Sequence, residues 1–176
     1  MLLNNKARAI SFSGVLLAFN CLVFILINII PSNTIFLMAL ASLFPSIIVI
    51  ELGIKYSFIY SLASIILAFF IISNKGHFFT YCFLFSIYAL SKALIEKNIE
   101  KRYLQYIVKL IYASISFSLI YYFYSLFLDY KAINADNFVM LLLVLALLFI
   151  FLLYDYFFTL FIKYYHEKIR NKIIKK

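Results

Sequence analysis

Six stretches of predominantly apolar residues dominate the sequence, separated by short polar or charged segments. The stretches cover residues 9–30, 35–50, 56–72, 78–95, 105–128 and 137–162. Each is close to the length of about 20 residues that an α-helix needs to cross the hydrocarbon of a bilayer. A backbone in hydrocarbon must satisfy its own polar groups, which a helix does within one segment. The sequence therefore predicts an all-α, polytopic integral membrane protein with a single six-helix transmembrane domain.

Composition supports a membrane location for the whole chain. Hydrophobic residues make up 66% of the 176 residues, and the mean hydropathy is +1.04. A soluble domain of this size cannot bury so much apolar surface, so lipid is the expected solvent and the first partner. The abundance of Ile, Lys, Asn, Phe and Tyr and the absence of Trp suit an AT-rich bacterial genome, so we expect the bacterial cytoplasmic membrane.

The distribution of Lys and Arg predicts the orientation. Alternating the loops between two sides places fourteen of the sixteen cationic residues on one side and only Lys75 and Lys131 on the other. Cytoplasmic loops carry the excess of positive charge, so both termini are expected inside. The net charge of +9 then reports orientation rather than nucleic-acid binding. The basic tail, residues 163–176, is expected to anchor the last helix at anionic headgroups.

Several kinds of catalytic site are missing from the sequence. The chain has three glycines and no GxxxxGK[ST] phosphate loop, so it is not expected to hydrolyse nucleotides by itself. No ionisable residue falls near the expected bilayer midplane, where such residues usually mark function. Asp155 lies about 27 Å along the last helix from Asn137. At that inner edge we expect it to pair with Lys92 or Lys109. No enzyme activity, metal or cofactor is expected.

One enzymatic alternative remains. His77 and Cys82 suggest a membrane cysteine peptidase of the kind that processes peptide pheromones, because a histidine can generate a thiolate nucleophile. Five residues along a helix leave the two side chains about 140° apart. The expected topology also places both on the outer side, so the peptidase is a remote alternative.

Two stripes of small residues share the same spacing. Offsets of 0, 4, 7 and 11 residues fall on one face of a helix. In a bilayer, small residues let another helix approach closely, so each stripe is a candidate docking face. The stripes are Ala7, Ser11, Gly14 and Ala18 in the first stretch and Ser57, Ser61, Ser64 and Ala68 in the third.

Polar side chains gather toward the predicted outer side. If their helix faces converge, they form an outward pocket of phenol rings, hydroxyls and a few charges, as a small-molecule site requires. Tyr81 and Tyr88 are expected on one face of the fourth stretch. The alternative is that these Ser and Tyr residues satisfy helix contacts and the interfacial aromatic belt. The candidates are Asn28, Asn33, Lys75, His77, Tyr81, Tyr88, Ser118, Tyr121, Tyr122, Ser125 and Asp129.

With six spans, both termini inside and small-residue stripes on the first and third spans, the chain resembles the S component of energy-coupling factor (ECF) transporters. The resemblance implies a subunit that binds a vitamin-like small molecule from the outer side. It also implies docking, through the two stripes, on a transmembrane coupling subunit that joins cytoplasmic ATPases. The alternative is a membrane scaffold or an accessory protein without a transport role.

Overall fold

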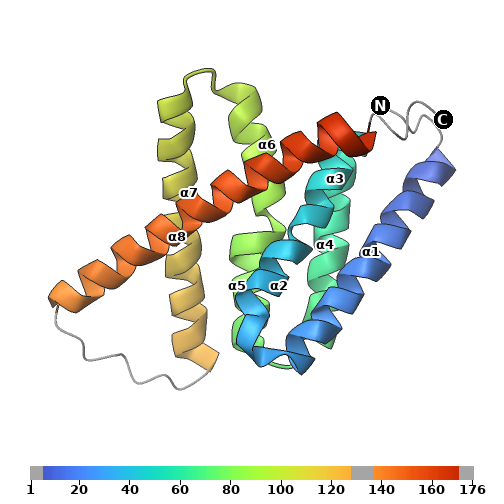
Figure 1. The fold of residues 1–176 in the computed structure, drawn as a ribbon. Helices are drawn as coiled ribbons and strands as arrows, with labels where there is room; N and C mark the ends of the chain where they lie inside the picture. The colour runs from blue at the N-terminus through green and yellow to red at the C-terminus, as the bar shows by residue number, and fades with distance from the viewer. Residues whose placement is uncertain (1–5, 128–136, 171–176) are drawn as a thin grey trace.

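A computed structural model describes residues 6–127 and 137–170, which form helices and contain no strand (Figure 1). Four spans are single helices, and two are interrupted. The continuous helices are α1 (Lys6–Ile29), α4 (Ile54–Ile71), α7 (Arg102–Phe127) and α8 (Asn137–Tyr164). Six helical spans in the described residues are long and apolar enough to cross a membrane. The predicted all-α class and the six spans are confirmed, with boundaries that differ by a few residues.

The second span breaks near its middle. A 3-10 turn (Pro31–Asn33) leads into α2 (Thr34–Ala41), and α3 (Leu43–Leu52) follows after Ser42. Pro45 explains the position of the break, because proline has no N–H to donate and its ring clashes with the carbonyl four residues earlier, that of Ala41. The Ser42 hydroxyl forms a hydrogen bond with the Tyr154 hydroxyl of α8 at 2.7 Å, which ties the break to the last span.

The fourth span is also irregular near its middle. It consists of α5 (Lys75–Thr80), a π-helical segment (Tyr81–Ser86) and α6 (Tyr88–Asn98). The Phe83 carbonyl within the π segment accepts hydrogen bonds from the Tyr112 hydroxyl at 2.9 Å and the Ser116 hydroxyl at 3.1 Å, both on α7. Irregular backbone at membrane depth is tolerated where protein groups satisfy it, as they do here. A second π segment (Tyr165–Arg170) continues α8.

The helices form one bundle with α8 laid obliquely across it (Figure 1). α1 packs against α2 and α4, α4 packs against α3, and the fourth span lies between this group and α7. The beginning of α1 and the end of α8 lie at the same end of the molecule in Figure 1. At this end Arg170 reaches Glu51 at the end of α3, with 3.6 Å between Nε and Oε1.

The core is largely aromatic and follows the fourth span. Phe24, Tyr81 and Tyr88 are completely buried, and Phe158 is nearly so. By contrast, α1, α7 and α8 expose large apolar side chains along their outer faces. Exposed apolar surface of this extent is expected of helices that face lipid.

Candidate functional site

The centre of the bundle contains a polar network, which we call the midplane network. Asn20 of α1 donates from Nδ2 to the Tyr81 hydroxyl at 3.3 Å and to the Ser64 hydroxyl at 3.4 Å. The Ser64 and Tyr81 hydroxyls are also hydrogen-bonded to each other. All three side chains are fully buried. Among the described residues, Asn20 Oδ1 has no hydrogen-bond partner. A buried acceptor without a partner is costly, so this oxygen is the unsatisfied polar atom of the midplane network.

The backbone around the midplane network is irregular. The π segment supplies Tyr81, and the break at Ser42 lies about halfway along the second span. α2 packs against the π segment, so the two interruptions are neighbours. In many transporters, substrate sites lie near the bilayer midplane where discontinuous helices meet. Asn20 is not among the site residues predicted from sequence, although an Asn near the middle of an apolar stretch is a signal.

Four charged side chains, which we call the charge ring, join α6, α7 and α8. Lys92 of α6 pairs with Asp155 of α8 and with Glu96 at 2.9 Å. Lys109 of α7 pairs with Glu96 at 2.8 Å and with Asp155 at 3.0 Å. The expected pairing of Asp155 is confirmed, and it involves both lysines rather than one. Tyr88 adds a hydrogen bond to Asp155.

The charge ring is buried except at Glu96, whose side chain is 38% exposed. Lys92, Lys109 and Asp155 are each at most 4% exposed. Two cations and two carboxylates contact one another in alternation, so their formal charges cancel. Breaking such a buried arrangement leaves an uncompensated charge, which is strongly unfavourable. We interpret the charge ring as the clamp that holds α6, α7 and α8 together.

Several expected site residues are engaged within the chain. The Asn28 side chain donates to the Ile71 carbonyl at 2.7 Å and accepts from the Ser73 N–H at 3.0 Å. The Lys75 ammonium donates to the Phe69 carbonyl at 2.8 Å. These bonds join or cap the end of α1, the end of α4 and the start of α5, and they satisfy polar groups that helix ends leave open.

Tyr81 and Tyr88 do not lie on one face of the fourth span, contrary to expectation. Tyr81 joins the midplane network with α1 and α4, whereas Tyr88 bonds to Asp155 of α8. The π segment between them changes the direction of the side chains that follow it. These two tyrosines therefore belong to separate networks inside the bundle and do not form one outward wall.

The remaining outer residues are dispersed over the surface. Asn33 is exposed and His77 is half-buried at the start of α5. No hydrogen bond joins the described side chains of His77 and Cys82, which is half-buried in the π segment. Ser118, Tyr121, Tyr122 and Ser125 are exposed on α7, and Asp129 lies outside the described residues.

The two small-residue stripes have different surroundings. Ser57, Ser61, Ser64 and Ala68 are buried within the chain. The Ser57 hydroxyl donates to the Pro45 carbonyl at 2.9 Å, and the Ser61 hydroxyl donates to the Ser86 carbonyl at 3.1 Å. The stripe on α4 is thus occupied by α3 and the fourth span. Its assignment as a docking face is corrected, because no face remains for a partner in this conformation.

The stripe on α1 faces outward. Ala7, Ser11, Gly14 and Ala18 are all exposed. A Cβ atom added at Gly14 would meet no atom within 4 Å. The α1 stripe can therefore be approached by another helix, as the sequence suggested for both.

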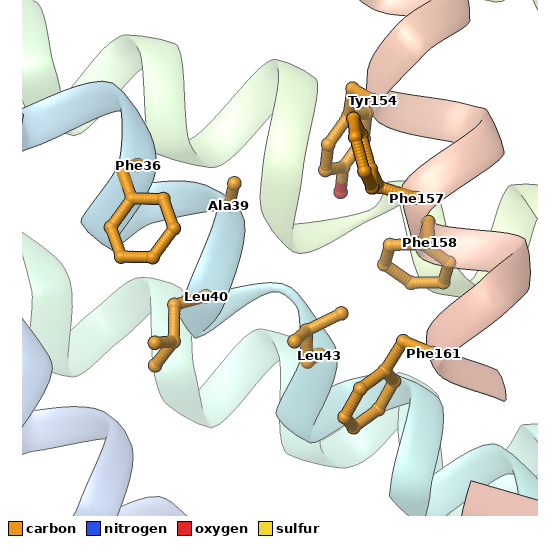
Figure 2. A pocket seen from close by; sticks show the side chains of 8 residues that line it. All are labelled: Phe36, Ala39, Leu40, Leu43, Tyr154, Phe157, Phe158 and Phe161. Carbon is orange, nitrogen blue, oxygen red and sulfur yellow. The ribbon is translucent and has the colours of Figure 1, made fainter. Parts of the chain in front are cut away.

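Two grooves flank α8. The first, which we call the α2–α8 groove, has a volume of about 390 Å³. Figure 2 shows its two walls, with Phe36, Ala39, Leu40 and Leu43 opposite Tyr154, Phe157, Phe158 and Phe161. The second, the α7–α8 groove, has a volume of about 400 Å³. Its lining residues are Ser114, Phe117, Ser118 and Tyr121 of α7 and Leu143, Val144, Leu147 and Leu148 of α8.

Comparison of this chain with protein-family models, curated proteins and solved structures finds no match.

Proposed function

We propose that this chain is the membrane-embedded binding subunit of a small-molecule importer, similar in role to the S component of ECF transporters. It lies in the bacterial cytoplasmic membrane with both termini inside. It binds a vitamin-like molecule that arrives from the outer side. A transmembrane coupling subunit, attached to cytoplasmic ATPases, docks on the α1 stripe and supplies the energy.

The observation that carries this proposal is the unpartnered Asn20 Oδ1 in the midplane network. A fully buried amide oxygen beside the π segment of the fourth span supports this role, because transporter sites often lie where helices are interrupted. Tyr81 and Ser64 provide two hydroxyls beside the amide. A ligand with a hydrogen-bond donor would satisfy Asn20 and could exchange bonds with both hydroxyls.

The proposal is tested by native mass spectrometry of gently purified protein, with Asn20→Leu and Tyr81→Phe as variants. Leu has nearly the shape of Asn but accepts no hydrogen bond, so retained ligand should fall at least tenfold in Asn20→Leu. Tyr112→Phe is the matched control, because its hydroxyl serves the Phe83 carbonyl outside the midplane network. It should retain ligand at the wild-type level.

Two results would refute the binding role. One is wild-type protein that retains no small molecule after purification from its native membrane. The other is equal retention of the small molecule by wild type and by Asn20→Leu, provided that the variant elutes as a folded, monodisperse species.

A second candidate function is a membrane scaffold or accessory protein that binds another membrane protein without transport. It is favoured by the internal engagement of Asn28, Lys75 and Tyr88, together with the exposed α1 stripe. It predicts that Gly14→Leu removes a co-purified membrane protein although no small molecule is retained by either form. A co-purified ATPase together with a retained small molecule would favour the importer instead.

A further inference from the structure

The α7–α8 groove lies where α8 crosses α7 obliquely (Figure 1). Along α7 its lining begins at Ser114 and ends at Tyr121, and along α8 it extends from Leu143 to Leu148. Leu143, Val144 and Tyr121 are each at least 44% exposed. Because these helices are long and apolar enough to span a membrane, the open side of the groove faces lipid. Its volume falls in the range of small-molecule sites.

The two walls of the groove differ in chemistry. The α8 wall is entirely apolar and consists of four aliphatic side chains. The α7 wall contains three hydroxyl-bearing residues around Phe117. The small side chains of Ser114 and Ser118 leave space that larger residues would fill, so they account for the hollow on this wall.

The hydroxyls of the α7 wall are not equally available. Ser114 donates to the Leu110 carbonyl at 3.0 Å, and Ser118 donates to the Ser114 carbonyl at 2.9 Å. Both serine donors are thus used within α7. The Tyr121 hydroxyl has no partner among the described residues and its side chain is 51% exposed. A phenol can both donate and accept, so Tyr121 presents a free polar group at the outer end of an apolar channel.

The α2–α8 groove provides an internal comparison. It has almost the same volume but only one hydroxyl, that of Tyr154 (Figure 2). That hydroxyl is already hydrogen-bonded to Ser42 at 2.7 Å. The α2–α8 groove therefore offers a ligand contact surface alone, whereas the α7–α8 groove offers an apolar channel with a free hydrogen-bonding group at one end.

We propose that the α7–α8 groove binds a single-chain amphiphile, a long-chain fatty acid or fatty alcohol that enters sideways from the bilayer. The oxygen of its head exchanges hydrogen bonds with the Tyr121 hydroxyl. Its chain runs inward between Phe117 and the aliphatic wall of Leu143, Leu147 and Leu148. Neither α7 nor α8 contributes to the midplane network, so this site is additional to the proposed small-molecule site and stands without it.

The test uses hexadecanoic acid that carries a photoreactive diazirine, with the full chain in phosphatidylcholine nanodiscs. Cross-linked peptides should map to residues 114–121 and 143–148. Unlabelled hexadecanol should compete, and hexadecane should not. Tyr121→Phe removes one hydroxyl from an exposed ring and should weaken labelling about threefold to tenfold, the range for a lost hydrogen bond. Tyr122→Phe is the matched control, because the neighbouring exposed tyrosine does not line the groove, and labelling should not change.

A second variant tests occupancy of the channel. Val144→Trp should fill the groove and abolish labelling of both walls, and Tyr154→Phe in the α2–α8 groove should leave labelling unchanged. Equal labelling of Tyr121→Phe and wild type would overturn the proposal. So would equal labelling of the two grooves, or effective competition by hexadecane, since either result would mean that chain contact alone directs the label. A cross-linked dimer joined through residues 143–148 would identify a second copy of the chain as the occupant and overturn it as well.

Discussion

The stripes on α1 and α4 have the same spacing but differ in burial. On α4, three serines and an alanine are buried, and Ser57 and Ser61 donate to backbone carbonyls of neighbouring segments. On α1, the corresponding residues are exposed and Gly14 has open space around it. Spacing identifies a face that another helix can approach closely. Whether that helix belongs to the same chain depends on what the rest of the fold places beside the stripe.

The neighbours of α4 explain the difference. Ser57 bonds to the carbonyl of Pro45 in α3, and Ser61 bonds to that of Ser86 at the end of the π segment. A carbonyl oxygen has two lone pairs, so each of these carbonyls can accept from a serine hydroxyl where the segments pack closely. The residues of the α1 stripe are exposed instead. If this comparison is correct, substitutions in the α4 stripe should change stability, and substitutions in the α1 stripe should change partner binding.

The largest effect on stability is expected in the charge ring, where the buried side chains are charged. Asp155→Leu removes the carboxylate between Lys92 and Lys109 and leaves both cations buried. The free energy of unfolding should fall by about 3–5 kcal/mol, as for other broken buried ion pairs. Equilibrium unfolding in mixed micelles measures it. Lys163→Ala, an exposed charge on the same helix, should have no measurable effect. A loss below 1 kcal/mol for Asp155→Leu would contradict the clamp.

A leucine in the buried stripe should have the next largest effect. Ser64→Leu forces a larger side chain into the midplane network and removes a partner of Tyr81. Overpacking and the lost hydrogen bond together should cost about 3 kcal/mol. Thermal unfolding in detergent checks this against Ser11→Leu, which places the same side chain on the α1 stripe. If both variants were equally stable, the distinction between the stripes would fail.

A smaller change isolates one hydrogen bond of the buried stripe. Ser57→Ala removes the donor to the Pro45 carbonyl and creates little space. Unfolding free energy should decrease by about 0.5–1.5 kcal/mol. Ser11→Ala, measured in parallel, should change it by less than about 0.5 kcal/mol. A larger loss for Ser11→Ala than for Ser57→Ala would reverse the comparison.

The smallest effect on stability is expected for Gly14→Leu. Its side chain has room, and leucine favours a helix more than glycine does, so stability should stay constant or rise by up to about 1 kcal/mol. Binding of a membrane partner should nevertheless be lost, because close approach requires the small residue. Co-purification from native membranes measures this, with Val15→Leu as the control at an exposed position about 100° around the helix from Gly14. Undiminished co-purification with Gly14→Leu would exclude α1 as the docking face.

Hydropathy and charge predicted the spans well because both properties are averaged over about 20 residues. The pairing of Asp155 was predictable from depth, since few cations lie at its level. The break at Ser42 had a local signal in Pro45, which hydropathy does not register. The π segment had none, because its carbonyls are satisfied by Tyr112 and Ser116 from a helix remote in sequence. The burial of the α4 stripe and the separation of Tyr81 from Tyr88 depend on such contacts.

The π segment also lets side chains of one span contact helices on two different sides. Tyr81 and Tyr88 are seven residues apart, so a continuous α-helix would align them on one face. A π segment holds one residue more than an α-helix of the same number of turns, and one residue corresponds to about 100° of rotation. Tyr81 thereby faces α1 and α4, whereas Tyr88 faces Asp155 of α8. The π segment thus acts as a one-residue insertion. Deletion of a single residue there would bring Tyr81 and Tyr88 back to one face and leave one of the two networks without its tyrosine.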